Sequence, residues 1–194
     1  MQLAPGAMFF LDTNIFVYAL LSAEPLKKQR ALQLVERALA SHLGCTSYQV
    51  VQEFANVALR KFAQRFTTEE CRQFIDAAMQ PLNRVASGPE LVNTALDLQG
   101  EIRFGFYDSL MLAGALQSGA EVVYTEDLQH NQLVRGSLRI VNPFLMTANS
   151  CAGFACGHAH LAGNCRLYGR SRQLRSGAGF QWPTDAGVCR CNQR

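Results

Sequence analysis

The chain has 194 residues, enough for one substantial hydrophobic core and an appendage but short for two full domains. Its net charge of +3 is unevenly distributed: the first 150 residues carry 12 Lys and Arg against 14 Asp and Glu, whereas the last 44 carry six Arg and a single Asp. Net charge therefore does not attract nucleic acid to the longer part, and any such binding there must rest on local groups and bound cations.

The cysteines and the N-terminal region bear on the cellular compartment. Five of the seven cysteines lie after residue 150, and only Cys45 and Cys71 lie before it. An odd total with two isolated cysteines in the longer part does not indicate a disulfide framework, and it predicts a reducing, cytoplasmic location. The apolar stretch at 8–21 is interrupted by polar residues and follows no charged segment, so we predict neither a signal peptide nor a membrane span.

Short apolar segments alternate with amphipathic segments over the first 145 residues. The candidate strands are 8–11, 42–45, 84–86, 121–125 and 138–141. Helical spacing of apolar residues predicts helices at 14–21, 26–40, 48–62, 90–102 and 108–119. Thr67 and Glu70 match a capping box that opens one more helix, which Pro81 ends. This alternation predicts an α/β fold, with a parallel sheet covered by helices on both faces.

Four acidic residues are expected to meet at one edge of this sheet. Asp12 directly follows the first strand, and Asp127 follows the strand at 121–125. The carboxyl ends of parallel strands share one edge, where the functional crevice of such folds lies. Glu53 belongs to a polar stripe on the third helix, which begins near this edge, and Asp108 is expected to begin a helix there.

Four converging carboxylates repel one another unless cations neutralise them. Mg²⁺ or Mn²⁺ takes oxygen ligands, and it can orient and deprotonate a water for in-line attack on a phosphodiester. The expected products carry a 5′-phosphate and a 3′-hydroxyl. Asn14 and Thr125 stand close to ligand positions in the sequence and are expected to hydrogen-bond the carboxylates or a metal-bound water. Catalysis by one metal ion or by two stays open.

Each acidic residue also has an explanation that involves no catalysis. Asp12 and Asp108 fit helix N-caps, Asp127 fits a turn, and Glu53 fits a solvated helix surface. Their joint placement at one sheet edge is what favours a site.

Four segments together resemble a known family. They are FLDTNI at 10–15, SYQVVQEFAN at 47–56, YDSLMLA at 107–113 and VVYTEDL at 122–128. In this order and over about 120 residues, they are similar to a PIN domain, and most similar to the VapC-type toxin ribonucleases of toxin–antitoxin pairs. The resemblance covers 8–144 and excludes the tail.

The resemblance implies a Rossmann-like three-layer α/β/α sandwich that cleaves single-stranded or structured RNA with Mg²⁺ or Mn²⁺. It implies metal binding and catalysis by Asp12, Glu53, Asp108 and Asp127, with Asn14 and Thr125 in support. A homodimer and an antitoxin protein are the implied partners. Two alternatives stay open: an RNA-processing nuclease that has no antitoxin, and a PIN-like module that binds RNA or protein without cutting it.

Two other classes that begin with a strand and an aspartate fit less well. A haloacid-dehalogenase-type phosphohydrolase places a second Asp two residues after the first, where this chain has Asn14. A receiver-like domain needs a lysine late in the sheet, and Lys61 is the last lysine of the chain.

Basic and aromatic residues near the acids are candidate RNA contacts. Arg60 and Lys61 lie toward the end of the Glu53 helix, Arg65 lies just beyond it, and all three fit a phosphate contact, although a solvated helix end explains them equally well. Tyr107 fits base stacking or packing at a helix entrance.

The segment 146–194 has a different character from the rest of the chain. Seven of the 15 glycines lie after residue 150, and the same segment holds candidate zinc ligands at Cys151, Cys156, His158, His160, Cys165, Cys189 and Cys191, but no C-x₂-C pair occurs there. We therefore expect a nuclease domain at 8–145 followed by a disordered, arginine-rich tail rather than a zinc site. The residues before Met8 add nothing that this fold needs, so translation can start at Met1 or at Met8.

Overall fold

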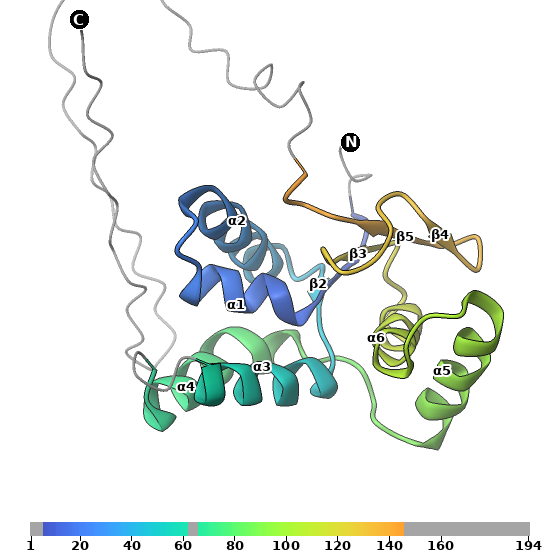
Figure 1. The fold of residues 1–194 in the computed structure, drawn as a ribbon, viewed down its shortest axis with the longest axis horizontal. Helices are drawn as coiled ribbons and strands as arrows, with labels where there is room; N and C mark the ends of the chain where they lie inside the picture. Colours follow the sequence, from blue (N-terminus) through green and yellow to red (C-terminus); the bar gives the residue numbers. More distant parts are fainter. Residues whose placement is uncertain (1–5, 62–65, 146–194) are drawn as a thin grey trace, which may run out of the picture. The chain divides into compact units, whose positions relative to one another are not determined.

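The computed structural model describes residues 6–61 and 66–145, in which helices flank a five-stranded sheet (Figure 1). The strands are β1 (Phe9–Leu11), β2 (Gly44–Cys45), β3 (Val122–Tyr124), β4 (Leu133–Val134) and β5 (Leu138–Val141). The helices are α1 (Thr13–Leu21), α2 (Pro25–Ser41), α3 (Tyr48–Lys61), α4 (Thr68–Phe74), α5 (Pro89–Ile102) and α6 (Phe106–Gln117). A π-helical turn, η1 (Ile75–Met79), and a 3₁₀ turn, η2 (Gln80–Leu82), continue α4.

The order of the strands places a crevice between β1 and β3. The sheet runs β2-β1-β3-β5-β4, and all neighbouring strands are parallel except β4 and β5, which are antiparallel. From β1 the chain proceeds to β2 on one side, whereas β3 leads to β5 on the other. Connections that diverge in this way leave a crevice beyond the carboxyl ends of the two central strands, which is where ligands bind in open α/β sheets.

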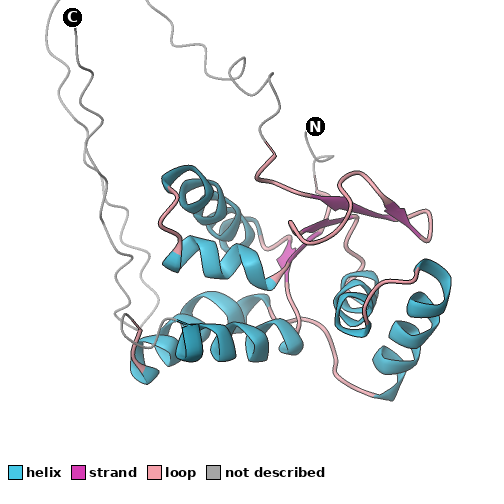
Figure 2. Cartoon of the chain, viewed as in Figure 1, coloured by secondary structure: helices cyan, strands magenta, loops and turns pink. Residues whose placement is uncertain are grey.

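The two faces of β1 are covered by different helices. Side chains alternate along a strand, so Phe9 and Phe10 point to opposite faces of the sheet. The Arg37 guanidinium of α2 lies over the Phe9 ring, 5.1 Å from its centroid. On the other face, a Cβ added to Gly114 of α6 would stand 3.7 Å from the Phe10 ring. Along β1, α2 and α6 therefore lie on opposite faces of the sheet, and Figure 2 shows helices around the strands.

A cluster of buried aromatic side chains joins α1, α3 and α4. The Phe74 ring of α4 lies 5.1 Å from that of Phe54 in α3 and 6.5 Å from that of Phe16 in α1, centroid to centroid. All three side chains are fully buried. Aromatic side chains bury large apolar areas and favour such offset or edge-to-face contacts. This packing fixes α3, and with it Glu53, next to α1.

Strand β2 needs a glycine at its first position. A Cβ at Gly44 would stand 2.2 Å from the Cβ of Ala38 in α2, a distance that real atoms do not reach. Only glycine therefore lets β2 approach α2 closely enough to pair with β1.

The three-layer α/β class predicted from the sequence is confirmed, with corrections to individual elements. Residues 84–86 form no strand, because the only pairing in this region is an isolated bridge between Thr46 and Asn83. The antiparallel edge strand β4 was not predicted. The capping box of Thr67 and Glu70 is present, but the regular helix that it opens ends at Phe74, well before Pro81.

Two further predictions concern the C-terminal tail and membrane-spanning helices. The predicted tail at 146–194 lies outside the described residues. Within the two described ranges, no helix is both long enough and apolar enough to pass through a bilayer.

Candidate active site

The register of the two central strands brings Asp12 and Thr125 together. Leu11 and Tyr124 are paired in the sheet, so the residues that follow them lie side by side at the carboxyl edge. The Asp12 N–H continues the ladder by donating to the Tyr124 carbonyl oxygen at 3.2 Å. The Thr125 hydroxyl then donates to Asp12 Oδ2 at 2.7 Å. Thr125 and Asp12 are 113 residues apart in the sequence, so they meet only because β1 and β3 are neighbours in the sheet.

Asp12 is both the N-cap of α1 and the centre of a polar network. Its Oδ1 accepts from the Thr13 N–H at 2.6 Å, so the N-cap role predicted as a simple alternative is present. The Asn14 amide donates to Asp12 Oδ2 at 3.1 Å, to Thr125 Oγ1 at 3.3 Å and to Asp127 Oδ2 at 3.3 Å. Asn14 thus links Asp12 to Asp127. The Asp12 carboxylate both caps α1 and belongs to the network of acidic side chains.

Glu53 reaches the network through a residue that the sequence analysis did not select. The Thr13 hydroxyl donates to Glu53 Oε2 at 2.9 Å, across 40 residues of sequence. Glu53 lies on the exposed side of α3, opposite the buried Val50 and Phe54, as its polar stripe predicted. Only its position next to Asp12 in the sequence could have indicated Thr13. A hydroxyl at the start of a helix can bond either to a neighbouring site residue or to the backbone of that helix, so this position does not distinguish the two roles.

Asp108 lies within the first turn of α6 and does not begin that helix. The helix begins at Phe106, and its N-cap is Gly105, so the N-cap alternative for Asp108 is wrong. A backbone hydrogen bond with Gly105 lowers the pKa of Asp108, but burial and the nearby charge of Asp127 outweigh it and raise that pKa. This influence of Asp127 indicates that the two carboxyl groups lie near each other.

Burial dominates the electrostatics of Asp12. The side chain is only 7% exposed, and the pKa of its carboxyl is raised to about 7 from an ordinary value of 3.8, with desolvation as the largest cause. The charges of Asp127 and Glu53 contribute to this increase in pKa, while the hydrogen bonds from Thr125 and Thr13 oppose it. Near neutral pH the carboxylate is therefore only partly ionised unless a cation compensates its charge.

The residues present fit a hard divalent cation that keeps much of its water. Over residues 6–61 and 66–145, no three His, Cys, Asp or Glu side chains are packed closely enough to enclose a metal ion by themselves. Mg²⁺ usually binds one or two carboxylates and completes its coordination with waters and substrate phosphate oxygens, so an enclosed cluster is not required. The Asn14 Oδ1 atom is buried without a hydrogen-bond partner, which leaves one more oxygen free beside Asp12.

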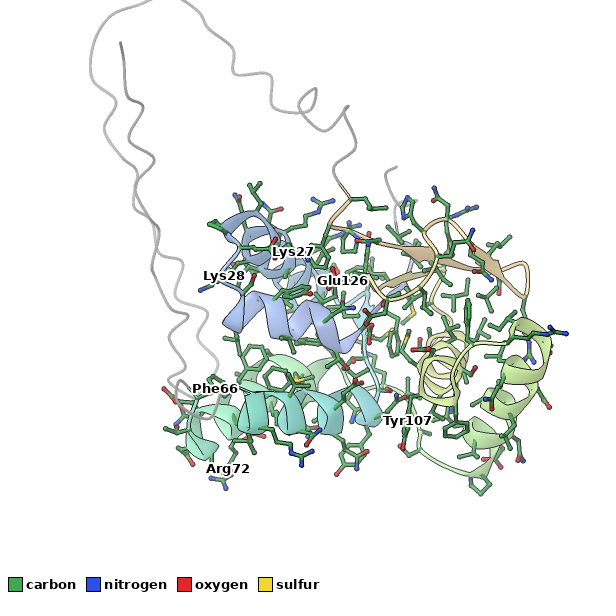
Figure 3. The ribbon with its side chains drawn as sticks, viewed as in Figure 1. Lys27, Lys28, Phe66, Arg72, Tyr107 and Glu126 are labelled. Atoms are coloured by element: carbon green, nitrogen blue, oxygen red, sulfur yellow. The ribbon has the colours of Figure 1, made fainter. Side chains whose placement is uncertain are left out.

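The structure describes the side chains of only some of the predicted RNA contacts. Arg60 is exposed on α3, whereas the side chains of Lys61 and Arg65 lie outside the described part of the chain. Tyr107, in the first turn of α6, is 72% exposed (Figure 3). Its carbonyl oxygen accepts from the Gln49 amide of α3 at 3.2 Å, so the first turns of α3 and α6 are neighbours.

The fold and these contacts define an α/β domain with a network of acidic side chains at the carboxyl ends of its two central strands. The family model of the PIN domain matches residues 9–135. The chain therefore belongs to the PIN domain family, as the four sequence segments indicated. Among curated proteins, no match was found.

Two solved structures are similar to this chain. A toxin–antitoxin complex from Klebsiella pneumoniae superposes with a TM-score of 0.50 at 20% identity, over 71% of this chain and 98% of that one. Mycobacterium tuberculosis VapC20, described as a sarcin-ricin loop cleaving toxin, gives a TM-score of 0.46 at 18% identity, over 61% of this chain and 89% of that one. At 20% identity, the likeness to the Klebsiella pneumoniae structure concerns the fold alone.

Proposed function

We propose that this protein is a metal-dependent endoribonuclease that cleaves single-stranded RNA and leaves 5′-phosphate and 3′-hydroxyl ends. PIN domains are generally nucleases, and this chain belongs to that family. The observation that carries the proposal is the convergence of Asp12, Glu53 and Asp127 in one hydrogen-bonded network, with Asp108 close enough to Asp127 for their charges to interact.

The four acids form the proposed binding site for Mg²⁺ or Mn²⁺, in which one or two carboxylates bind an ion directly and the others bind it through waters. When bound, the metal supplies a water activated for in-line attack and stabilises the leaving oxygen. Thr125 and Asn14 hold the Asp12 carboxylate in one orientation through bonds of 2.7 and 3.1 Å. Thr13 holds Glu53 in the same way. Such partners fix ligand orientation, and their loss typically reduces metal affinity or activity about 10- to 100-fold.

The RNA strand is proposed to lie across the first turns of α3 and α6. Tyr107 presents an exposed ring next to Asp108, where an unpaired base can stack. Arg60 at the end of α3 is exposed, and with Lys61 and Arg65 it is the proposed contact for phosphates.

A cleavage assay on the full chain tests the enzyme reading. The protein is incubated with a pool of single-stranded RNA in Mg²⁺, Mn²⁺ or EDTA, beside Asp12→Asn and Asp108→Asn. The matched control is Asp97→Asn, which changes an exposed aspartate of α5. We expect metal-dependent cleavage that the two site variants lose and the control keeps. RNA binding that all variants retain, without cleavage in any metal, favours the non-catalytic binding module instead.

A small antitoxin is the proposed protein partner, and a homodimer is the proposed assembly. The support is the family resemblance together with a structure of the same fold that is a toxin–antitoxin complex. Expression of the full chain in a bacterial host is expected to arrest growth, and Asp12→Asn to relieve the arrest. Growth unaffected by an RNA-cleaving chain would favour an RNA-processing nuclease without an antitoxin. Light scattering of the purified chain decides the oligomeric state.

A further inference from the structure

The segment after β3 sends alternate side chains to two different places. Thr125 and Asp127 point into the crevice, where they bond to Asp12 and Asn14 respectively. Glu126, between them, points the other way and meets helices α1 and α2 (Figure 3). A carboxylate between two site residues is thus kept out of the site.

Both oxygens of Glu126 are held by hydrogen bonds. The Tyr18 hydroxyl of α1 donates to Oε1, and the Lys27 ammonium of α2 donates to Oε2 at 3.1 Å. The Glu126 side chain is 20% exposed and that of Lys27 is 28% exposed, so water screens this ion pair less than a pair on the open surface.

Aromatic rings complete the surroundings of Lys27. Its ammonium lies 4.8 Å from the Tyr18 ring centroid and 5.7 Å from that of Phe144, which follows β5. The two rings contact each other edge to face, with centroids 5.1 Å apart. We name these four residues, Tyr18, Lys27, Glu126 and Phe144, the Glu126 cluster. It joins α1, α2, the segment after β3 and the segment after β5.

We propose that the Glu126 cluster positions the segment 125–127 for the metal site, so that Tyr18, Lys27 and Glu126 are positioning residues of the nuclease. The segment leaves the sheet at Thr125, and an anchor beyond this point fixes where Asp127 stands. Lys27 also neutralises a carboxylate that would otherwise add a fifth negative charge beside the crevice. This inference rests on the proposed function, because it assigns these residues to the same reaction.

The reaction is sensitive to such positioning. A misplacement of about 1 Å can cost about 100-fold in rate, even when the changed residue is far from the chemistry. Removal of the anchor changes none of the proposed metal ligands, but it leaves the segment 125–127, which carries Asp127, less firmly held. We therefore expect lower kcat and weaker metal binding, with RNA affinity in EDTA unchanged.

The test compares Lys27→Met and Glu126→Gln with a control ion pair. Glu101 and Arg135 form a salt bridge at 2.6 Å between α5 and the turn before β5, and neither residue bonds to a proposed ligand. Glu101→Gln therefore removes an ion pair of the same kind elsewhere. Measurements are kcat at saturating metal, the Mn²⁺ dissociation constant by electron paramagnetic resonance, and thermal stability for each full-length variant.

We expect both cluster variants to lose roughly 10-fold in kcat and to bind Mn²⁺ several-fold more weakly. The double variant is expected to be no worse than the more damaged single variant, because both changes remove one interaction. Lys27→Arg retains a cation that can contact both the carboxylate and the rings, so it is expected to restore most of the activity. Glu101→Gln is expected to leave kcat and Mn²⁺ affinity unchanged.

Hydrogen exchange separates failure of this inference from failure of the proposed function, since it requires no activity. The amides of 125–127 are expected to exchange faster in Lys27→Met than in the wild-type chain or Glu101→Gln. If exchange is faster in Lys27→Met but the wild-type chain cleaves no RNA, the proposed function fails and the anchoring of 125–127 by the Glu126 cluster stands. Unchanged exchange, or kcat and Mn²⁺ affinity within about two-fold of wild type in an active enzyme, overturns the positioning role.

Discussion

The buried carboxylate of Asp12 makes the stability of the metal-free protein depend on pH. Its pKa is raised to about 7 from 3.8, mainly by burial. Because one pKa unit corresponds to about 1.4 kcal/mol, ionisation of Asp12 lowers the free energy of unfolding by up to about 4 kcal/mol. The folded state holds this proton more tightly than the unfolded state does. The stabilisation is therefore complete below the unfolded pKa and is lost as the pH rises through about 7.

Asp12→Asn removes the charge and keeps the N-cap hydrogen bond. The new amide oxygen accepts from the Thr13 N–H, whereas the new amide nitrogen replaces Oδ2 and no longer accepts from Asn14 and Thr125, which costs about 1 kcal/mol for each lost hydrogen bond. In EDTA at about pH 8, the removed charge outweighs this cost, so we expect the variant to be more stable than the wild type by about 1–3 kcal/mol, or on the order of 2–12 °C in Tm. At about pH 4 this advantage should be lost. Excess Mg²⁺ should stabilise the wild type and leave the variant unchanged.

Urea or thermal unfolding followed by circular dichroism measures these differences. Asp97→Asn serves as the control, because it removes one aspartate charge from an exposed position of α5. The reasoning is refuted by a metal-free Asp12→Asn variant that is less stable than the wild type at about pH 8, or by a stability difference that is the same at both pH values.

Three further substitutions test the geometry of the crevice. Thr125→Val removes a hydrogen bond that lowers the pKa of Asp12, so the acidic limb of the pH–rate profile should move to higher pH by about one unit. Gly105→Ala places a Cβ 3.1 Å from Asp108 Oδ2, so kcat should fall several-fold while the fold is kept, because φ at this position is −59°. Tyr107→Leu should weaken binding of single-stranded RNA in EDTA about 5- to 100-fold, whereas Tyr107→Phe should not.

Matched controls separate these effects from general damage. Gly100→Ala changes a glycine of α5 whose added Cβ meets no atom within 4 Å, so it should raise stability slightly without changing kcat. Equal losses of kcat in the two alanine variants would contradict the contact with Asp108. An unshifted pH profile in Thr125→Val, measured at saturating metal, would show that its hydroxyl does not control Asp12. A Tyr107→Phe variant as weak as Tyr107→Leu would show that the hydroxyl, rather than stacking, binds RNA.

Local patterns determined most elements of the fold. The apolar run before Asp12 predicted β1, the capping box of Thr67 predicted the start of α4, and helical spacing predicted that Glu53 faces outward. These features depend on nearest neighbours and on the period of a helix or strand, both of which are visible in sequence. The predicted strand at 84–86 was wrong because a strand requires a partner along its length, and sequence does not reveal whether one is available.

The sequence also determined which acids are candidates, while the tertiary structure decided what connects them. Thr13 meets Glu53 across 40 residues, and Asn14 meets Asp127 across 113, because the order and register of the strands bring them to one edge. The raised pKa of Asp12 likewise comes from burial by surrounding layers. The Tyr18, Lys27 and Glu126 contacts could not be predicted, since each residue alone fits an ordinary surface position. Motifs specify chemistry locally, whereas desolvation and long-range contacts exist only once the sheet has formed.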